Sequence, residues 1–290
     1  MVHNLAELLS VSEQRGVPLW RIVLENEMRL SGQDEATVLS KLQNRFDVME
    51  KSAMKALQKP QPTAGNLISG ISAPQNTYAL GGETLCGGFI NYVMALALSC
   101  SEVNASMGRI CAAPTAGACG ILPAVLIGLR EKLHLSLEQT LHGLLTASGI
   151  GAVIMENATV SAAAGGCQAE CGVAAAMAAA AAVEMAGGTP HAAVNASGFA
   201  LINAMGLICD PVAGLVQVPC AQRNASQAVN ALLSADLAMA GMLCLIPPDE
   251  IIDAMYKVGK LLPVQLRETA QGGIAATKTG KQIAADILRS

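Results

Sequence analysis

Residues Cys171–Ala186 read CGVAAAMAAAAAVEMA, a segment built almost entirely from small apolar side chains. A segment of this length and composition is typical of a buried helix. Hydrophobic residues make up 52 % of the 290 residues and aromatic residues only 2 %, so the interior has to be packed from alanine and aliphatic side chains. Because small side chains let helices approach closely, the segment predicts a tightly packed helical core.

Apolar segments that alternate with glycine-rich loops continue on both sides of this stretch. Strand signals are scarce, and the best of them, Leu215–Val218, is short. We therefore predict an all-α fold whose chemistry is carried on the loops between helices. The predicted helices after residue 60 are Gly87–Ser99, Ile121–Leu133, Leu137–Met155, Cys171–Ala186, Ala192–Met205, Ser226–Met242 and Pro248–Leu262.

The first 60 residues differ from the rest in charge. They hold 8 of the 18 lysines and arginines and 8 of the 22 acidic residues, in helical patterns. Asn4 with Glu7 predicts a capping box, and Pro18 suits the first turn of a second helix. The proline-containing segment Lys59–Thr63 then marks a linker. We expect an N-terminal helical layer over residues 1–60 and a helical domain that carries the chemistry over residues 61–290, packed as one compact unit.

The composition bears on partners and location. Met185–Cys209 is an uncharged run of 25 residues, but it is interrupted by glycine, proline, histidine and asparagine, which favours a helical core over a membrane span. A net charge of −4, without a basic cluster with interleaved aromatic residues, argues against nucleic-acid binding. The N-terminus does not read as a signal peptide, so we expect a cytoplasmic protein.

Nine cysteines in a reducing compartment point to metal binding or catalysis rather than to disulfides. Cys167, Cys209 and Cys220 lie among glycine, proline and small polar residues, where backbone turns could bring thiolates together. Three such thiols predict a metal or cluster with one coordination position left open. The thiol ligands alone leave zinc and iron both open. The remaining cysteines, apart from Cys171, are interpreted as small core residues: Cys86, Cys100, Cys111, Cys119 and Cys244.

The distribution of cations limits the chemistry further. Residues 133–256 contain no lysine, so this core offers no Schiff-base lysine for pyridoxal phosphate, and Lys278 in a terminal glycine- and threonine-rich segment would be an unusual host. Arg223 is the only arginine of that region and lies three residues after Cys220. It could neutralise a thiolate-held cluster or a substrate carboxylate, or lie on the surface.

Other candidate residues fall in loops. Asn104–Arg109 and Pro114–Gly120 combine small residues with polar donors, and the second leads into a helix, which favours binding of a carboxylate or phosphate. Glu156 or Glu170 could transfer protons, or could be a partly exposed salt-bridge partner. His134, His142 and His191 fit surface or core roles better than metal ligation. No catalytic base is assigned.

Several motifs together resemble the iron-sulfur-dependent L-serine dehydratases, and specifically the α subunit of the two-subunit form. The resemblance covers nearly all of residues 65–285, and the intervals of 42 and 11 residues between the three cysteines fit it. The matching segments are Pro114–Gly117, Glu156–Ser161, Gly166–Gln168, Cys209–Val212, Gly214–Cys220 and Gly273–Thr277. Two positions depart from the family pattern: Cys171, where an aliphatic residue is expected, and Lys278, where proline is expected.

The resemblance implies a [4Fe-4S] cluster held by Cys167, Cys209 and Cys220, elimination of water from L-serine to give pyruvate and ammonia, and no pyridoxal phosphate. It also implies a separate β subunit, and so a hetero-oligomer. A related lyase acting on L-threonine or L-cysteine, and a non-catalytic zinc-thiolate module, stay open as alternatives. Polar or flexible positions in the matching segments, together with the arginine near the third cysteine, are candidates for substrate binding: Thr115, Gly117, Asn157, Ser161 and Arg223.

Overall fold

The computed structural model describes residues 2–289. Within this range the chain forms thirteen α-helices and no β-strand, with one isolated bridge between Cys209 and Arg267, so the predicted all-α fold is confirmed. The helices are α1 (Leu5–Arg15), α2 (Leu19–Ser31), α3 (Glu35–Gln58), α4 (Ser72–Leu80), α5 (Gly87–Ala105), α6 (Ile121–Lys132), α7 (Leu137–Asn157), α8 (Ala162–Gly165), α9 (Val173–Met185), α10 (Pro190–Ala204), α11 (Cys220–Met239), α12 (Pro248–Leu261) and α13 (Lys278–Arg289).

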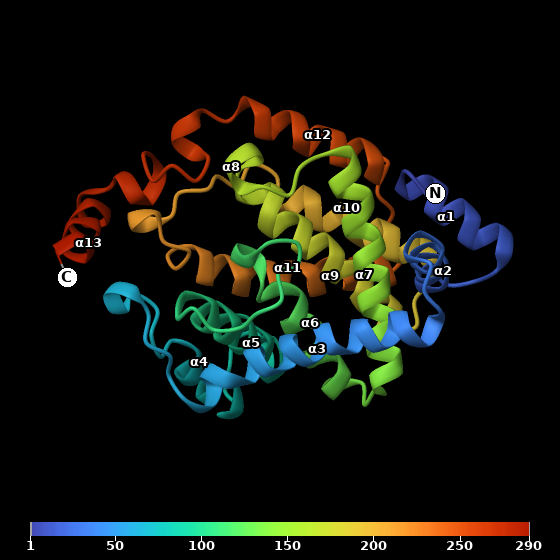
Figure 1. The fold of residues 1–290 in the computed structure, drawn as a ribbon, viewed down its shortest axis with the longest axis horizontal. Coiled ribbons are helices and arrows are strands. Elements are labelled where there is room, and N and C mark those ends of the chain that lie inside the picture. The colour runs from blue at the N-terminus through green and yellow to red at the C-terminus, as the bar shows by residue number, and fades with distance from the viewer. Residues whose placement is uncertain (1, 290) are drawn as a thin grey trace.

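The alanine-rich helix α9 lies at the centre of the molecule. Every residue of α9 except Glu184 is buried, and α6, α7, α10 and α11 pack around it (Figure 1). Glycines make this close packing possible on the α7 side. A Cβ atom at Gly143 would lie 2.6 Å from the Met185 side chain, and one at Gly151 would lie 2.9 Å from Met177. The small side chains of α9 therefore let several helices contact one helix at once.

The first three helices pack against the later ones through a shared hydrophobic core, to which they contribute Leu5, Leu19 and Phe46. Helix α3 crosses the lower half of the molecule in Figure 1 and packs against α5. The predicted capping box at the start of α1 is half formed. The Asn4 side chain accepts a hydrogen bond from the Glu7 amide at 2.7 Å, but the Glu7 carboxylate accepts from the His3 amide instead.

The structure corrects several expectations about local structure. Leu215–Val218 is not a strand, because the Val212 amide donates to the Val218 carbonyl at 2.9 Å and closes a tight loop. Helix α11 begins at Cys220, six residues before the predicted start. Lys278 is not in a loop, since it is the first residue of α13. Helices α4, α8 and α13 were not predicted at all.

The uncharged run over residues 185–209 is divided between the end of α9, a turn and α10. In the part of the chain that the structure describes, no helix is both long and apolar enough to cross a membrane. Cys86 is exposed, so its interpretation as a core residue is wrong, whereas Cys100 and Cys119 are buried as expected. Cys86 lies just before the first turn of α5, outside its buried face.

Candidate metal centre

Cys167, Cys209 and Cys220 come from three separate segments. Cys167 precedes the π-turn Gln168–Gly172 that leads into α9, Cys209 follows α10, and Cys220 is the first residue of α11. They are only 2 %, 4 % and 8 % exposed. Burial first, and then the negative charge of the Cys167 thiolate, raises the pKa of Cys209 and of Cys220, and the charge of Cys220 adds to the effect on Cys209. The three thiols predicted as ligands therefore lie close enough for their charges to interact.

The turn at Cys167 is fixed by its two neighbours. Gly166 has φ +76°, and a Cβ atom there would lie 2.8 Å from the Leu207 carbonyl oxygen, so only glycine fits. The Gln168 amide donates to that same carbonyl at 3.1 Å, and its side chain donates to the Met255 carbonyl at 3.1 Å. These contacts attach the Cys167 segment to the segment after α10 and to α12.

Backbone contacts hold Cys209 in an extended conformation. Its amide donates to the Leu266 carbonyl, and its carbonyl accepts from the Glu268 amide, both at 2.9 Å. This backbone pairing brings Glu268 next to Cys209. The charge of the Glu268 carboxylate contributes to the raised pKa of both Cys209 and Cys220. The segment after α12 thus forms one wall of the site.

Arg223 supplies a positive charge to the thiols. Its guanidinium donates to the Asp210 carboxylate at 2.8 Å and to the Ile208 carbonyl at 2.7 Å. Asp210 is 2 % exposed, and its second oxygen accepts from the Ile274 amide at 2.8 Å. A hydrogen bond from Cys171 and, after it, the charge of Arg223 lower the pKa of Cys167. A lowered pKa favours the thiolate, the form that binds metal.

Two further groups lie beside Cys167. The thiols of Cys167 and Cys171 and a carboxylate oxygen of Glu170 lie within 4.8 Å of one another. The hydrogen bond to Cys167, together with burial, raises the pKa of Cys171 well above its usual range. The Thr115 hydroxyl donates a hydrogen bond to Glu170. Cys171 is therefore an interior thiol next to the site.

The five candidate substrate-binding residues divide into two groups. Thr115 and Gly117 lie against Glu170, and Arg223 lies against Cys167. Asn157 instead donates to the His3 and Val153 carbonyls, both at 2.8 Å. Ser161 is exposed at the start of α8. Within residues 2–289, neither Asn157 nor Ser161 forms a hydrogen bond with any of the cysteines.

Other candidates from the sequence have partners away from the thiols. Glu156 lies 2.7 Å from the His3 ring, on the surface. His142 stacks on Trp20 with ring centroids 3.6 Å apart. The His191 ring lies 3.0 Å from the Asn195 side chain. These contacts fit the surface and core roles expected for histidine in this sequence.

The sequence did not identify three residues that shape the site: Asp210, Asn224 and Glu268. Asp210 could have been identified from the sequence, because the lone arginine of an apolar region needs a carboxylate as its counter-charge when it is buried. The Asn224 side chain donates to the Gly117 carbonyl at 2.6 Å and accepts from the Gly120 amide at 2.8 Å. Neither Asn224 nor Glu268 lies in a pattern that would single it out.

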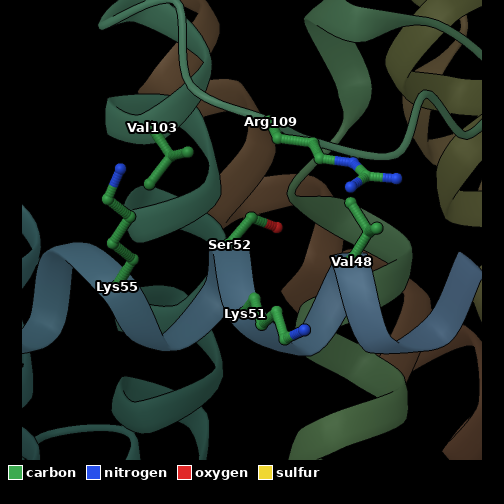
Figure 2. A pocket seen from close by; sticks show the side chains of 6 residues that line it. All are labelled: Val48, Lys51, Ser52, Lys55, Val103 and Arg109. Atoms are coloured by element: carbon green, nitrogen blue, oxygen red, sulfur yellow. The ribbon is translucent and has the colours of Figure 1, made fainter. Parts of the chain in front are cut away.

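A cavity of about 160 Å³ lies elsewhere, between α3 and the loop after α5 (Figure 2). Figure 2 shows the side chains of Lys51, Lys55 and Arg109 around it. No cysteine lines this cavity, so it is separate from the thiols of the candidate metal centre.

The chemistry of the donors fits an iron-sulfur cluster. Thiolates are the usual protein ligands of iron in such clusters, and the three thiols are buried beside a cation that can offset their negative charge. The backbone around the thiols is turn-rich, as a bulky cluster requires. The residues present therefore fit the group that the sequence resemblance implies.

Comparison with known proteins points to the same family as the sequence motifs. Residues 14–275 match the family described as serine dehydratase alpha chain. The chain is 47 % identical to the L-serine dehydratase, alpha chain, of Peptoniphilus asaccharolyticus over 100 % of its own length and 99 % of that protein. It is 43 % identical to the probable L-serine dehydratase, alpha chain, of Bacillus subtilis over 99 % of its own length and 96 % of that protein.

A longer relative matches over part of its length. The chain is 35 % identical to L-serine dehydratase 2 of Escherichia coli over 93 % of its own length, which is 60 % of that protein. The family match covers most of the chain, and its range includes the three cysteine segments. The protein therefore belongs to the serine dehydratase alpha chain family.

Proposed function

We propose that this chain is the α subunit of an L-serine dehydratase, an ammonia-lyase that converts L-serine into pyruvate and ammonia. What supports the proposal is that Cys167, Cys209 and Cys220 are all buried and that their charges act on one another, with Arg223 beside Cys167. Full-length identity to proteins named L-serine dehydratase supports the activity. Nine cysteines and a thiolate-held cluster favour a reducing compartment, so we place the enzyme in the cytoplasm.

The three thiolates would hold a [4Fe-4S] cluster. When bound, a cluster with one iron free of protein ligands supplies a Lewis acid for the β-hydroxyl group, which is otherwise a poor leaving group. Overall, the substrate loses its α-proton and its β-hydroxyl group as water, and the resulting enamine tautomerises and is hydrolysed to pyruvate and ammonia. No step of this sequence needs pyridoxal phosphate.

The protein's own residues hold and polarise this site. Arg223, fixed by Asp210, places a permanent positive charge beside Cys167 and favours its thiolate form. Thr115 and Gly117 contact Glu170, which lies next to Cys167. We propose that Thr115, Gly117 and Arg223 bind or orient the substrate. For Asn157 and Ser161 the same role is proposed only from their place in the segments that match the family.

We further propose that the chain works together with a β subunit. The two relatives that match along their whole length are named alpha chains, and the Escherichia coli relative carries additional sequence beyond the matching region. Neither of the carboxylates near the thiols, Glu170 and Glu268, is assigned as the base for the α-proton. A partner that closes the site and supplies that base would account for both observations.

The test is turnover by anaerobically reconstituted protein, co-expressed with its β subunit, with L-serine, L-threonine and L-cysteine compared as substrates. We expect pyruvate and ammonia from L-serine at the highest kcat/KM, together with visible thiolate-to-iron absorption. Preference for L-threonine or L-cysteine would instead indicate a related lyase. A colourless protein that binds zinc and turns over none of the three would contradict the proposal.

A further inference from the structure

Glu170 is a buried carboxylate in the metal centre that the proposed reaction has not yet used. It is 8 % exposed, and one of its oxygens lies within 4.8 Å of the thiols of both Cys167 and Cys171. Its oxygen Oε1 accepts the Thr115 hydroxyl hydrogen. Within residues 2–289 it forms no ion pair and no second hydrogen bond, so Oε2 has no partner.

The carboxylate is held in place by backbone packing. A Cβ atom at Gly117 would lie 2.5 Å from Oε1 and 2.8 Å from Oε2 of Glu170, so the backbone at this glycine packs directly on the carboxylate. Asn224 binds the Gly117 carbonyl at 2.6 Å and the Cys220 carbonyl at 2.9 Å. Glu170 is therefore fixed relative to a segment that carries one of the predicted cluster ligands.

The charge of Glu170 reaches the whole site. It contributes to the pKa of the thiols of Cys167, Cys171, Cys209 and Cys220. The nearby cation, Arg223, is already engaged by the Asp210 carboxylate. A buried carboxylate without a bound cation is energetically costly, and that cost is recovered when a cation binds to it.

An amino-acid substrate brings such a cation. Its α-ammonium group carries three donors and one positive charge, which match a carboxylate with a free oxygen. We propose that Glu170 binds the α-ammonium group of the substrate and so selects amino acids over hydroxy acids that lack it. This inference rests on the proposed function, because it names the residue that recognises one part of that substrate.

The experiment compares L-serine with 3-hydroxypropionate, which keeps the carboxylate and the β-hydroxyl group but lacks the ammonium group. Glu170→Gln in the reconstituted complex keeps the size of the side chain and an oxygen for the Thr115 hydroxyl. We expect KM for L-serine to rise about 10- to 100-fold, as for loss of a charged hydrogen bond. The inhibition constant of 3-hydroxypropionate should stay within about threefold, or tighten, because no charged partner of this ligand is lost.

Binding is also followed without turnover, by titrating each ligand into the complex and recording the change in cluster absorption and electron paramagnetic resonance. Iron and sulfide contents should match those of the wild type. If Glu170→Gln loses its iron, Glu170→Asp keeps the charge and should still prefer L-serine over 3-hydroxypropionate. A Glu170→Asp protein that retains its iron without this preference would overturn the inference.

Glu184→Gln is the matched control. Like Glu170, Glu184 accepts a threonine hydroxyl, from Thr146 at 3.1 Å, but it lies at the far end of α9 from Glu170. This variant should bind both ligands as the wild type does. Glu268→Gln tests the other carboxylate near the thiols.

Two results would refute the role of Glu170: equal weakening of both ligands in Glu170→Gln, or loss of the preference in Glu268→Gln but not in Glu170→Gln. A wild-type complex that releases no pyruvate from L-serine contradicts the proposed function instead. In that case the ligand titrations still decide whether Glu170 distinguishes the two compounds.

Discussion

At the scale of single residues, the thiols differ by the backbone around them. Cys167, Cys209 and Cys220 are buried in turns or at a helix start, and the charge of Arg223 acts on Cys167 and Cys220. Cys244 is half-buried, and its thiol donates to the Asn195 carbonyl at 3.4 Å. It is therefore held by a local contact that requires no metal.

We predict that replacing any one of the three ligands by alanine (Cys167→Ala, Cys209→Ala or Cys220→Ala) abolishes cluster binding and activity, because two thiolates cannot retain the cluster. Cys244→Ala should leave both intact. Iron and sulfide analysis of each purified variant, with pyruvate release from L-serine, measures the effect. A full complement of iron in any of the three would remove that cysteine from the ligand set.

The Asp210–Arg223 pair gives a second prediction at this scale. Asp210→Asn should lower the free energy of unfolding by about 3 kcal/mol, because it leaves a largely buried guanidinium without its counter-charge. Asp253→Asn, which breaks an exposed pair with Lys257, should cost less than about 1 kcal/mol. Chemical denaturation of the two proteins tests this, and equal losses would mean that the buried pair contributes no more than a surface pair.

At the scale of elements, close backbone contacts set how the helices approach the thiols. A Cβ atom at Gly259 of α12 would lie 2.8 Å from the Gly165 Cα atom and 3.2 Å from the Gln168 side chain. The obstacle is backbone, which cannot move aside as a flexible side chain does. Helix α12 is therefore held against α8 and the π-turn next to Cys167.

We predict that Gly259→Ala lowers the free energy of unfolding by about 1–3 kcal/mol, because α12 has to shift to make room. It should also reduce the iron retained per chain, since Gln168 adjoins Cys167. Gly81→Ala is the control: its φ is −71°, and an added Cβ atom would approach no atom closer than 3.5 Å. Unchanged stability and iron content in Gly259→Ala would show that α12 moves without cost.

The helix boundaries show which parts of the fold can be predicted from local sequence. The periodic segments α6 and α7 were predicted to within two residues at each end, because their apolar spacing is a property of the local chain. The start of α11 was predicted six residues late, since Cys220 and Arg223 look like turn residues in sequence. In the folded chain the Arg223 guanidinium bonds to Asp210 and to the Ile208 carbonyl, so the helix can begin at Cys220.

At the scale of the whole molecule, a β subunit should change the rate. We predict that the reconstituted chain alone holds the cluster but turns over L-serine slowly, and that adding the co-expressed β subunit raises kcat by about 10²–10⁴-fold, the contribution of one general base. Size-exclusion chromatography and pyruvate assays measure both effects. If the chain alone works at the rate of the mixture and the two do not co-elute, the site is complete within one chain.

The sequence by itself determined the helical fold and the three cysteine segments, because helix periodicity, capping and turn composition depend on residues a few positions apart. It also determined that Arg223 is the only cation of residues 133–256. Only the tertiary structure decided that Asp210 pairs with this arginine beside Cys167, and that Glu170 lies against Thr115 with one oxygen free. These contacts join segments 13 and 55 residues apart, and such distances are set by packing around α9 rather than by local spacing.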